Sequence, residues 1–170
     1  MITNITLTTK EKFLLEDQKT EEQICIQKYA NYANLAADPE LKSILNSNKK
    51  QEEEHLNTIN QLLSGKVPSM KSSQGSNSQS SNNSREESTG NSSQSSQSKA
   101  SSGGFQASDK DLCTDLLMTE KYVSGTYNTA IFEFKDPQVR DVLNHIQKEE
   151  QKHGESIYKY MESQGMYSPK

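Results

Sequence analysis

The chain has 170 residues, of which 30% are hydrophobic and 25% charged, and its formal net charge at neutral pH is −4. Ordinary globular domains are about 45–50% apolar, so this composition favours thin amphipathic helices over a thick β core. The net negative charge leaves no basic surface to bind nucleic-acid phosphates. No apolar run approaches the ~20 residues of a membrane span. Residues 1–15 lack the features of a secretion signal.

The first half of the chain predicts a helical hairpin over residues 9–64. Thr8 and Glu11 form a capping box, which indicates a helix over residues 9–37. Asp38 followed by Pro39 places an N-cap acid before a proline at the first helical position, and this pattern opens a second helix over residues 39–63. Both helices lack internal proline and glycine, so neither has an internal break.

A polar segment follows, which we expect to be a disordered linker over residues 65–107. Residues 71–104 contain 27 Ser, Asn, Gln or Gly and one apolar residue, a composition that cannot bury enough surface to fold. A linker of this length allows the flanking segments to pack within one chain or to be exchanged between two chains. A homo-oligomer is therefore left open by the sequence.

The last part of the chain predicts a second hairpin over residues 108–167, with helices over 109–135 and 137–163. It repeats the first hairpin at an offset of 98 residues, because Asp136-Pro137 matches Asp38-Pro39 and Tyr127 matches Tyr29. Each hairpin alone would expose an apolar stripe. We therefore expect an all-α four-helix bundle made of two duplicated antiparallel hairpins joined by a long linker.

Ionisable residues interrupt the predicted buried stripe of every helix at about the same height. The interruptions are Glu22, Glu52, His55, Glu120, Glu150 and His153. Converging carboxylates are costly to bury unless they are paired or bind a cation. Iron or manganese suits a site in which two helices each supply one Glu and the other two each supply a Glu-x-x-His pair. Here the chain resembles the ferritin-like di-metal carboxylate proteins, which implies two iron or manganese ions. The alternative is a polar core in which these residues share hydrogen bonds and protons.

The second hairpin is similar to the Coat F family of bacterial spore coat proteins. The matching residues are DLCTDLLMTEKY at 111–122, YNTA at 127–130, DPQVR at 136–140, Met161, and GMY at 165–167. The resemblance implies a ferritin-like hairpin that is made in the mother-cell cytoplasm and assembled with other coat proteins into the spore coat or onto the spore surface.

Two functions of different classes follow from these patterns. The first is a structural or assembly protein of the spore coat, with no catalytic residues, and it agrees with the absence of any nucleophile set or glycine-rich phosphate loop in the sequence. The alternative is a di-iron or di-manganese carboxylate oxidoreductase that acts on oxygen or peroxide. Metal storage without turnover is a third, weaker option.

Overall fold

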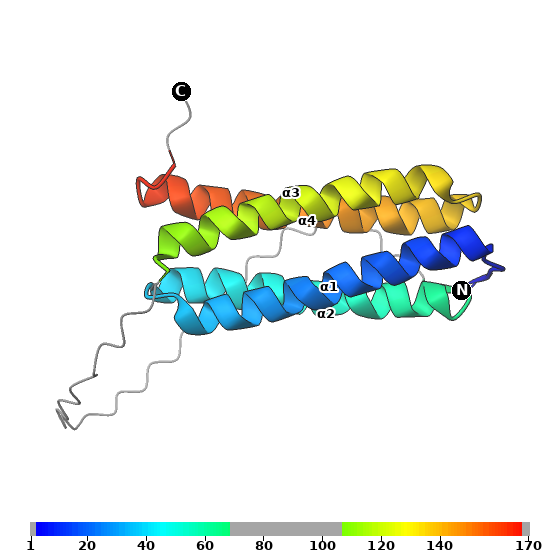
Figure 1. The fold of residues 1–170 in the computed structure, drawn as a ribbon, viewed down its shortest axis with the longest axis horizontal. Coiled ribbons are helices and arrows are strands. Elements are labelled where there is room, and N and C mark those ends of the chain that lie inside the picture. Colours follow the sequence, from blue (N-terminus) through cyan, green and yellow to red (C-terminus); the bar gives the residue numbers. More distant parts are fainter. Residues whose placement is uncertain (1–2, 69–106, 168–170) are drawn as a thin grey trace, which may run out of the picture. The chain divides into compact units, whose positions relative to one another are not determined.

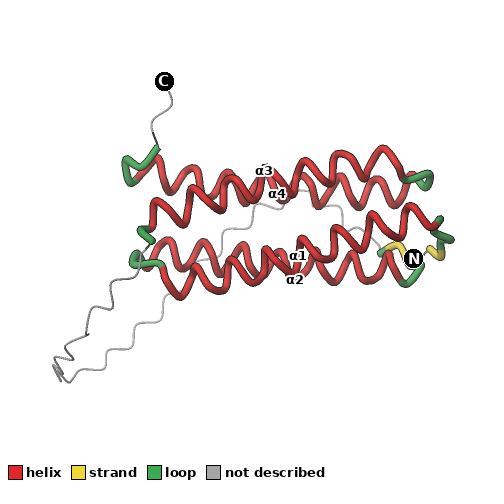
Figure 2. Tube along the Cα trace, viewed as in Figure 1, coloured by secondary structure: helices red, strands yellow, loops and turns green. Residues whose placement is uncertain are grey.

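The computed structural model describes residues 3–68 and 107–167, and its helices form a four-helix bundle (Figure 1). The helices are α1 (Thr9–Leu35), α2 (Pro39–Leu63), α3 (Asp109–Glu133) and α4 (Pro137–Ser163). α1 pairs with α2 and α3 with α4 as antiparallel hairpins, while α1 also lies against α3 and α2 against α4 (Figure 2). The predicted all-α bundle of two hairpins is therefore confirmed. Most of the predicted linker lies outside the described residues.

The helices begin at the predicted capping residues, but α1 and α3 end two residues earlier than the sequence suggested. Thr8 forms the expected capping box with Glu11, and the Asp38 side chain accepts a hydrogen bond from the Glu40 backbone N–H. Ala36 and Phe134, at the ends of α1 and α3, have extended ψ angles of 136° and 127°. The chain therefore leaves the helix before the Asp-Pro turn, where proline disfavours helical backbone in the preceding residue.

Each hairpin turn is held by a carboxylate from the other hairpin. Glu11 of α1 accepts a hydrogen bond of 3.0 Å from the backbone N–H of Lys135, between α3 and α4. Asp109 of α3 accepts bonds of 2.8 and 3.0 Å from the backbone N–H groups of Ala37 and Asp38, between α1 and α2. Glu11 and Asp109 are 98 residues apart, so these two turn clamps are related by the internal repeat.

Removing the charge of the Glu11 clamp is expected to destabilise the bundle in a pH-dependent way. Burial alone would raise the pKa of Glu11, but hydrogen bonds from Thr8 and Lys135 outweigh burial and lower it below the ordinary 4.5. The ionised Glu11 therefore stabilises the folded protein above pH 4.5, and this stabilisation is lost as the pH falls through the lower pKa of Glu11 in the folded state. Urea unfolding of Glu11→Gln should show a loss of about 1–2 kcal/mol at pH 7.

The same comparison at low pH supplies the control for this prediction. Once the Glu11 carboxyl is protonated in the folded protein, the wild type and Glu11→Gln should differ little in free energy of unfolding. Asp141→Asn, at an exposed position of α4, should match the wild type at both pH values. A constant difference between wild type and Glu11→Gln across the pH range would contradict the charged clamp.

A two-stranded antiparallel pair, which the sequence did not predict, joins the N-terminus to the end of α2. β1 (Thr3–Asn4) pairs with β2 (Lys66–Val67), and the Ile5 N–H donates to the Gly65 carbonyl at 2.9 Å. Val67 is buried in the core. Residues 65–67 were expected to start the disordered linker, and this expectation was wrong, because burial of Val67 and backbone pairing attach them to the folded unit.

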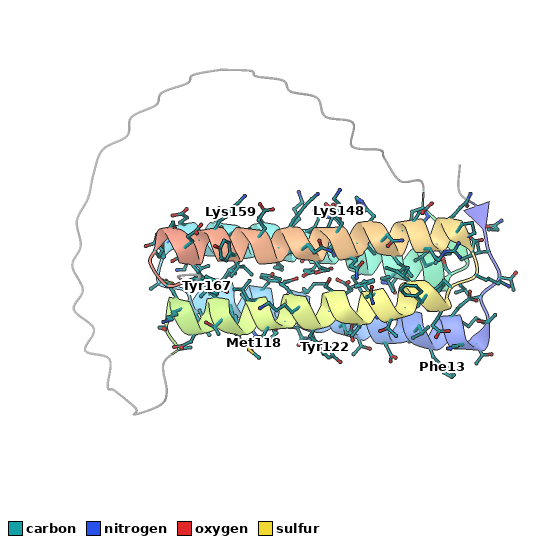
Figure 3. All side chains as sticks on the ribbon, turned by 90° about the horizontal axis from the view of Figure 1, so that it is seen from above. Phe13, Met118, Tyr122, Lys148, Lys159 and Tyr167 are labelled. Atoms are coloured by element: carbon teal, nitrogen blue, oxygen red, sulfur yellow. The ribbon has the colours of Figure 1, made fainter. Side chains whose placement is uncertain are left out.

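The core follows the helical stripes expected from the sequence. α2 buries every residue of its stripe: Leu41, Leu45, Asn48, Glu52, His55, Ile59 and Leu62. In α1 Ala33 is buried, whereas Tyr32 is half-buried and its hydroxyl donates to Asp115 of α3 at 2.7 Å. Among the described helices, none is long and apolar enough to cross a membrane. The side chains in Figure 3 show that charged groups such as Lys148 and Lys159 project outward.

Candidate metal centre

The six ionisable residues predicted from the sequence meet inside the bundle. Each comes from the middle of its helix, and each is less than 5% exposed: Glu22, Glu52, His55, Glu120, Glu150 and His153. Because Glu52 and His55, like Glu150 and His153, are three residues apart, both members of each pair project from the same face of their helix. The cluster therefore receives one carboxylate from α1, one from α3, and a carboxylate with an imidazole from α2 and from α4.

The cluster divides into two ligand sets that share two residues. In each set, one potential ligand atom per residue lies within 4.8 Å of all the others. The His55 position consists of Glu22, Glu52, His55 and Glu150, and the His153 position consists of Glu52, Glu120, Glu150 and His153. Glu52 and Glu150 belong to both positions, so each could contribute to holding a cation at either one.

Both histidines present the same ring nitrogen to the carboxylates. His55 Nδ1 lies 3.2 Å from a Glu52 oxygen and 2.9 Å from a Glu150 oxygen. His153 Nδ1 lies 3.2 Å from the other Glu52 oxygen and 3.4 Å from the other Glu150 oxygen. The two imidazole rings stack with their centroids 5.7 Å apart. The two histidines therefore use different oxygens of the same pair of carboxylates.

Several polar atoms of the cluster are buried without a hydrogen-bond partner of acceptable geometry. They are Glu22 Oε2, Glu52 Oε1, Glu120 Oε2, both oxygens of Glu150, and both ring nitrogens of His153. Buried polar atoms are normally paired, so a group of unpaired acceptors in one place indicates a missing partner. Carboxylate oxygens and imidazole nitrogens are the ligands that iron and manganese accept, and the residues present therefore fit two such ions.

The carboxylates of the cluster differ in their affinity for protons. Burial raises the pKa of Glu22 well above the ordinary value and that of Glu120 to about 8. Burial also raises the pKa of Glu52 and Glu150, but the two histidines close beside them outweigh burial, so the pKa of Glu52 is lowered and that of Glu150 falls to about 2. The two shared carboxylates are therefore ionised at neutral pH, whereas the two unshared ones hold a proton more tightly than an ordinary carboxyl group does.

The histidines are shifted in the opposite direction to that expected from burial alone. Burial disfavours the imidazolium form, but the surrounding carboxylates outweigh it, raising the pKa of His55 well above its usual range and that of His153 to about 11. Two imidazolium groups thus balance Glu52 and Glu150. Two divalent cations with four ionised carboxylates and two neutral imidazoles would also sum to zero, so cations can replace protons here without leaving a buried net charge.

Two buried tyrosines hold the unshared carboxylates across the hairpins. The Tyr29 hydroxyl donates to Glu120 and the Tyr127 hydroxyl donates to Glu22. Each tyrosine is thus paired with the acid of the opposite hairpin rather than with the acid of its own helix. Hydrogen bonds of this kind orient a carboxylate toward a metal position. The reciprocal arrangement also follows the internal repeat.

One residue outside the predicted set distinguishes the two positions. Glu149 lies on the outer side of His55, with its Oε2 atom 3.0 Å from His55 Nε2. The repeat places Gln51 at the equivalent position, and its amide donates to Glu149 at 3.0 Å rather than contacting His153. A comparison of the two Glu-x-x-His segments could have found this difference, because Glu149 and Gln51 stand in matching places before them.

The fold and the cluster define an all-α bundle with a buried carboxylate–histidine centre. The C-terminal hairpin carries a Coat F domain, since the model of that domain matches residues 108–170, and the resemblance seen in the sequence is confirmed for this segment. The match does not include the first hairpin. Over 63 residues the chain is 35% identical to the uncharacterized protein YusN of Bacillus subtilis (strain 168), covering 37% of this chain and 57% of YusN. No solved structure matches the chain.

Proposed function

We propose that the protein is a component of the bacterial spore coat or spore surface whose folded unit binds two divalent transition-metal ions. The Coat F domain of the second hairpin supports the coat assignment. The metal assignment rests on one observation, which is that two overlapping ligand sets share Glu52 and Glu150 at the centre of the bundle. A chance cluster of buried acids has no reason to include a histidine and an unshared glutamate on each side of a shared pair.

Iron and manganese are the proposed ions because the ligands combine hard carboxylate oxygens with imidazole nitrogen. The described part of the chain offers no thiolate to the centre, since neither ligand set contains a cysteine. Cys25 and Cys113 are free and buried, and burial raises the pKa of the Cys113 thiol to about 12. Both cysteines therefore act as small apolar residues of the core, and a site for a thiophilic metal is disfavoured.

Elemental analysis of the full chain, purified without a tag, tests the metal assignment. The expected content is two iron or manganese ions per chain, one for each ligand set. His55→Ala with His153→Ala should retain helicity and lose both ions. Protein that folds, binds no iron or manganese when either is supplied, and is unaffected by this double substitution would refute the metal centre and leave the polar-core interpretation.

The coat assignment needs a cellular test. Antibody labelling of sporulating cells should place the full chain first in the mother-cell cytoplasm and later on the coat or surface of the spore. It should be released with coat proteins when coats are extracted. Retention of the protein in the mother cell after the spore is complete would refute assembly into the coat, without bearing on the metal centre.

An oxidoreductase that acts on oxygen or peroxide is the second candidate. It is favoured by a cavity between α3 and α4 that reaches Glu120 and Glu150, because a small molecule could approach the centre through it. Two bound iron or manganese ions would supply the redox change. The chain's own residues would exclude water around the centre, orient the carboxylates through Tyr29 and Tyr127, and hold the proton shared by Glu149 and His55.

Replacing Glu149 by glutamine is expected to weaken binding at the His55 position. The carboxylate contacts the outer nitrogen of His55, and loss of such an outer partner typically costs about 10–100-fold in metal affinity. In a Mn²⁺ titration, Glu149→Gln should therefore separate one weakened site from one unchanged site. Glu53→Gln, on the exposed side of α2, is the matched control and should bind both ions normally. Equal weakening of both sites would contradict the assigned role.

A further inference from the structure

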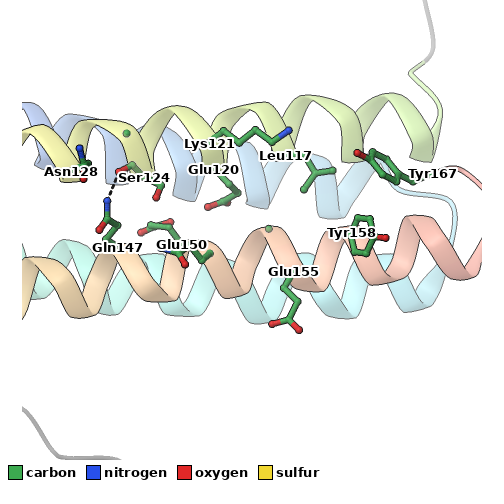
Figure 4. Close-up of a pocket in the computed structure, with 13 residues that line it drawn as sticks. Leu117, Glu120, Lys121, Ser124, Asn128, Gln147, Glu150, Glu155, Tyr158 and Tyr167 are labelled. Atoms are coloured by element: carbon green, nitrogen blue, oxygen red, sulfur yellow. Dashed lines mark hydrogen bonds between the residues drawn. The ribbon is translucent and has the colours of Figure 1, made fainter. Parts of the chain in front are cut away.

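A cavity of about 730 Å³ lies between α3 and α4, and its lining includes Glu120 and Glu150 (Figure 4). Sites for small organic molecules span roughly 300–1,000 Å³, whereas oxygen or peroxide needs only a fraction of this volume. We propose that this cavity binds an uncharged, planar aromatic molecule of one or two rings beside the carboxylates of the centre. Its role as a substrate site rests on the proposed function, but binding itself does not require a metal.

Two glycines keep the cavity open. A Cβ atom added to Gly125 would meet no atom within 4 Å, and one added to Gly154 would lie 4.0 Å from side-chain atoms of Glu120 and Leu117. Neither glycine has a positive φ angle, so the backbone does not require glycine at either position. A glycine inside a helix costs about 1 kcal/mol relative to alanine. The open space is thus maintained at some cost to helix stability.

The internal repeat shows that this space belongs to the second hairpin. The residues that match Gly125 and Gly154 at the offset of 98 are Gln27 and Leu56 in the first hairpin. Leu56 is partly buried in α2, so the first hairpin places a branched apolar side chain where the second has none. The two hairpins have the same ligands and the same tyrosines. They differ at the two positions that open the cavity.

The walls of the cavity suit a flat ring with a polar substituent. At one end Tyr158 and Tyr167 stand edge to face, with ring centroids 5.1 Å apart, close to Leu117 (Figure 4). At the other end the Gln147 amide donates to the Ser124 carbonyl at 2.8 Å. An aromatic ligand could pack against the tyrosines and the exposed glycine backbone. Neutral amide and hydroxyl groups at the other end could bind its hydroxyl or carbonyl group.

The charges around the cavity favour an uncharged ligand. The Glu150 carboxylate would repel an anion, and Glu120 and Glu150 lie 3.8 and 3.4 Å from His153 Nδ1, so this imidazole competes with a cationic ligand for both carboxyl groups. The Glu155 side chain points away from the interior of the cavity (Figure 4). Lys121, the cationic residue of the lining, is exposed at the rim. A charged ligand would therefore lose hydration without gaining a buried partner.

Titration of the metal-free full chain with 2-naphthol, followed by NMR, tests this proposal. The signals of Gly125, Gly154 and Tyr158 should shift together and saturate. Gly154→Leu introduces the residue found at the equivalent place in the first hairpin and should weaken binding by at least about tenfold, because the leucine occupies ligand space. Gly125→Gln should also weaken binding. Gln27→Leu, at the equivalent exposed position of α1, is the matched control and should bind like the wild type.

Several outcomes would overturn the proposal. These are the absence of saturable shifts at the three residues, undiminished binding in both glycine variants, or tighter binding of 2-naphthoate than of 2-naphthol. The titration uses metal-free protein, so its outcome does not depend on whether the protein binds metal. A failure to bind 2-naphthol can therefore be distinguished from a failure to bind metal ions. In protein shown to hold Mn²⁺, the signals of bound 2-naphthol should broaden, and sharp signals would contradict its placement beside the centre.

Discussion

Replacing Glu150 by glutamine is expected to abolish binding of both metal ions, whereas replacing Glu22 by glutamine should abolish only one. Glu150 contributes to both ligand sets and Glu22 contributes only to the His55 position. Glutamine keeps the size of the side chain but removes the charge and one of the two oxygen ligands. The stoichiometry measured by equilibrium dialysis against Mn²⁺ should therefore fall from two ions to none in one variant and to one in the other.

The repeat supplies further variants for this experiment. Glu52→Gln should behave like Glu150→Gln, and Glu120→Gln like Glu22→Gln, because each pair is related by the offset of 98 residues. Glu155→Gln, at an exposed position on α4, should retain both ions. Circular dichroism should show that each variant remains helical. If the shared and unshared glutamates gave the same stoichiometry, the sharing of Glu52 and Glu150 between the two positions would be wrong even if the protein binds metal.

Metal binding is expected to release up to four protons per chain near neutral pH, because ligand atoms must be deprotonated to bind. The protons come from His55, His153, Glu22 and Glu120, whose pKa values are all raised, that of Glu120 to about 8 and that of His153 to about 11. The shared carboxylates are already ionised and release none. Affinity for each ion should therefore rise with pH, by up to about 100-fold for each pH unit where two protons are released per ion.

Calorimetric titration in buffers of different ionisation enthalpy measures this release directly. The apparent binding enthalpy should change with the buffer in proportion to the number of protons released, which is at most about four for two ions at pH 7. The number of protons released should decrease as the pH rises above the Glu120 pKa of about 8, since that carboxyl is then ionised before metal binds. A metal affinity that does not depend on pH would show that ions bind elsewhere, at groups already deprotonated.

Much of the fold could be predicted because helix signals and hydrophobic periodicity are local. The stripe of α2 from Leu41 to Leu62 is buried throughout, since a three- and four-residue spacing determines which side of a helix faces its neighbours. Periodicity alone does not show at what height along the bundle a residue lies. The internal repeat supplied this information, because it placed Glu22, Glu52, Glu120 and Glu150 at the same height. The cluster could therefore be predicted from one sequence.

Other features depend on how the two hairpins are rotated against each other, and periodicity does not determine that rotation. The bonds from Tyr29 to Glu120 and from Tyr127 to Glu22 cross between hairpins, so their partners could not be assigned from spacing within a helix. The contact of Tyr32 with Asp115 has the same origin. The pairing of β1 with β2 involves only two residues in each strand, too few to leave an alternating pattern in the sequence.

The repeat also explains how one bundle can have a symmetric centre and asymmetric surroundings. The ligands, the tyrosines and the turn clamps are matched between the hairpins. The differences between the hairpins include Glu149 in place of Gln51, and Gly125 and Gly154 in place of Gln27 and Leu56. These differences lie around the centre rather than within it. In the proposed function, the first hairpin completes the metal centre and the second hairpin, which carries the Coat F domain, also provides the cavity.

Anomalous X-ray scattering from crystals grown with Mn²⁺ tests the metal centre most directly. Data collected at the manganese absorption edge should show two peaks inside the bundle, one beside Nδ1 of each of His55 and His153, with Glu52 and Glu150 between them. A bundle without anomalous peaks at this place, in which the four glutamates and two histidines contact only one another or water, would contradict the account.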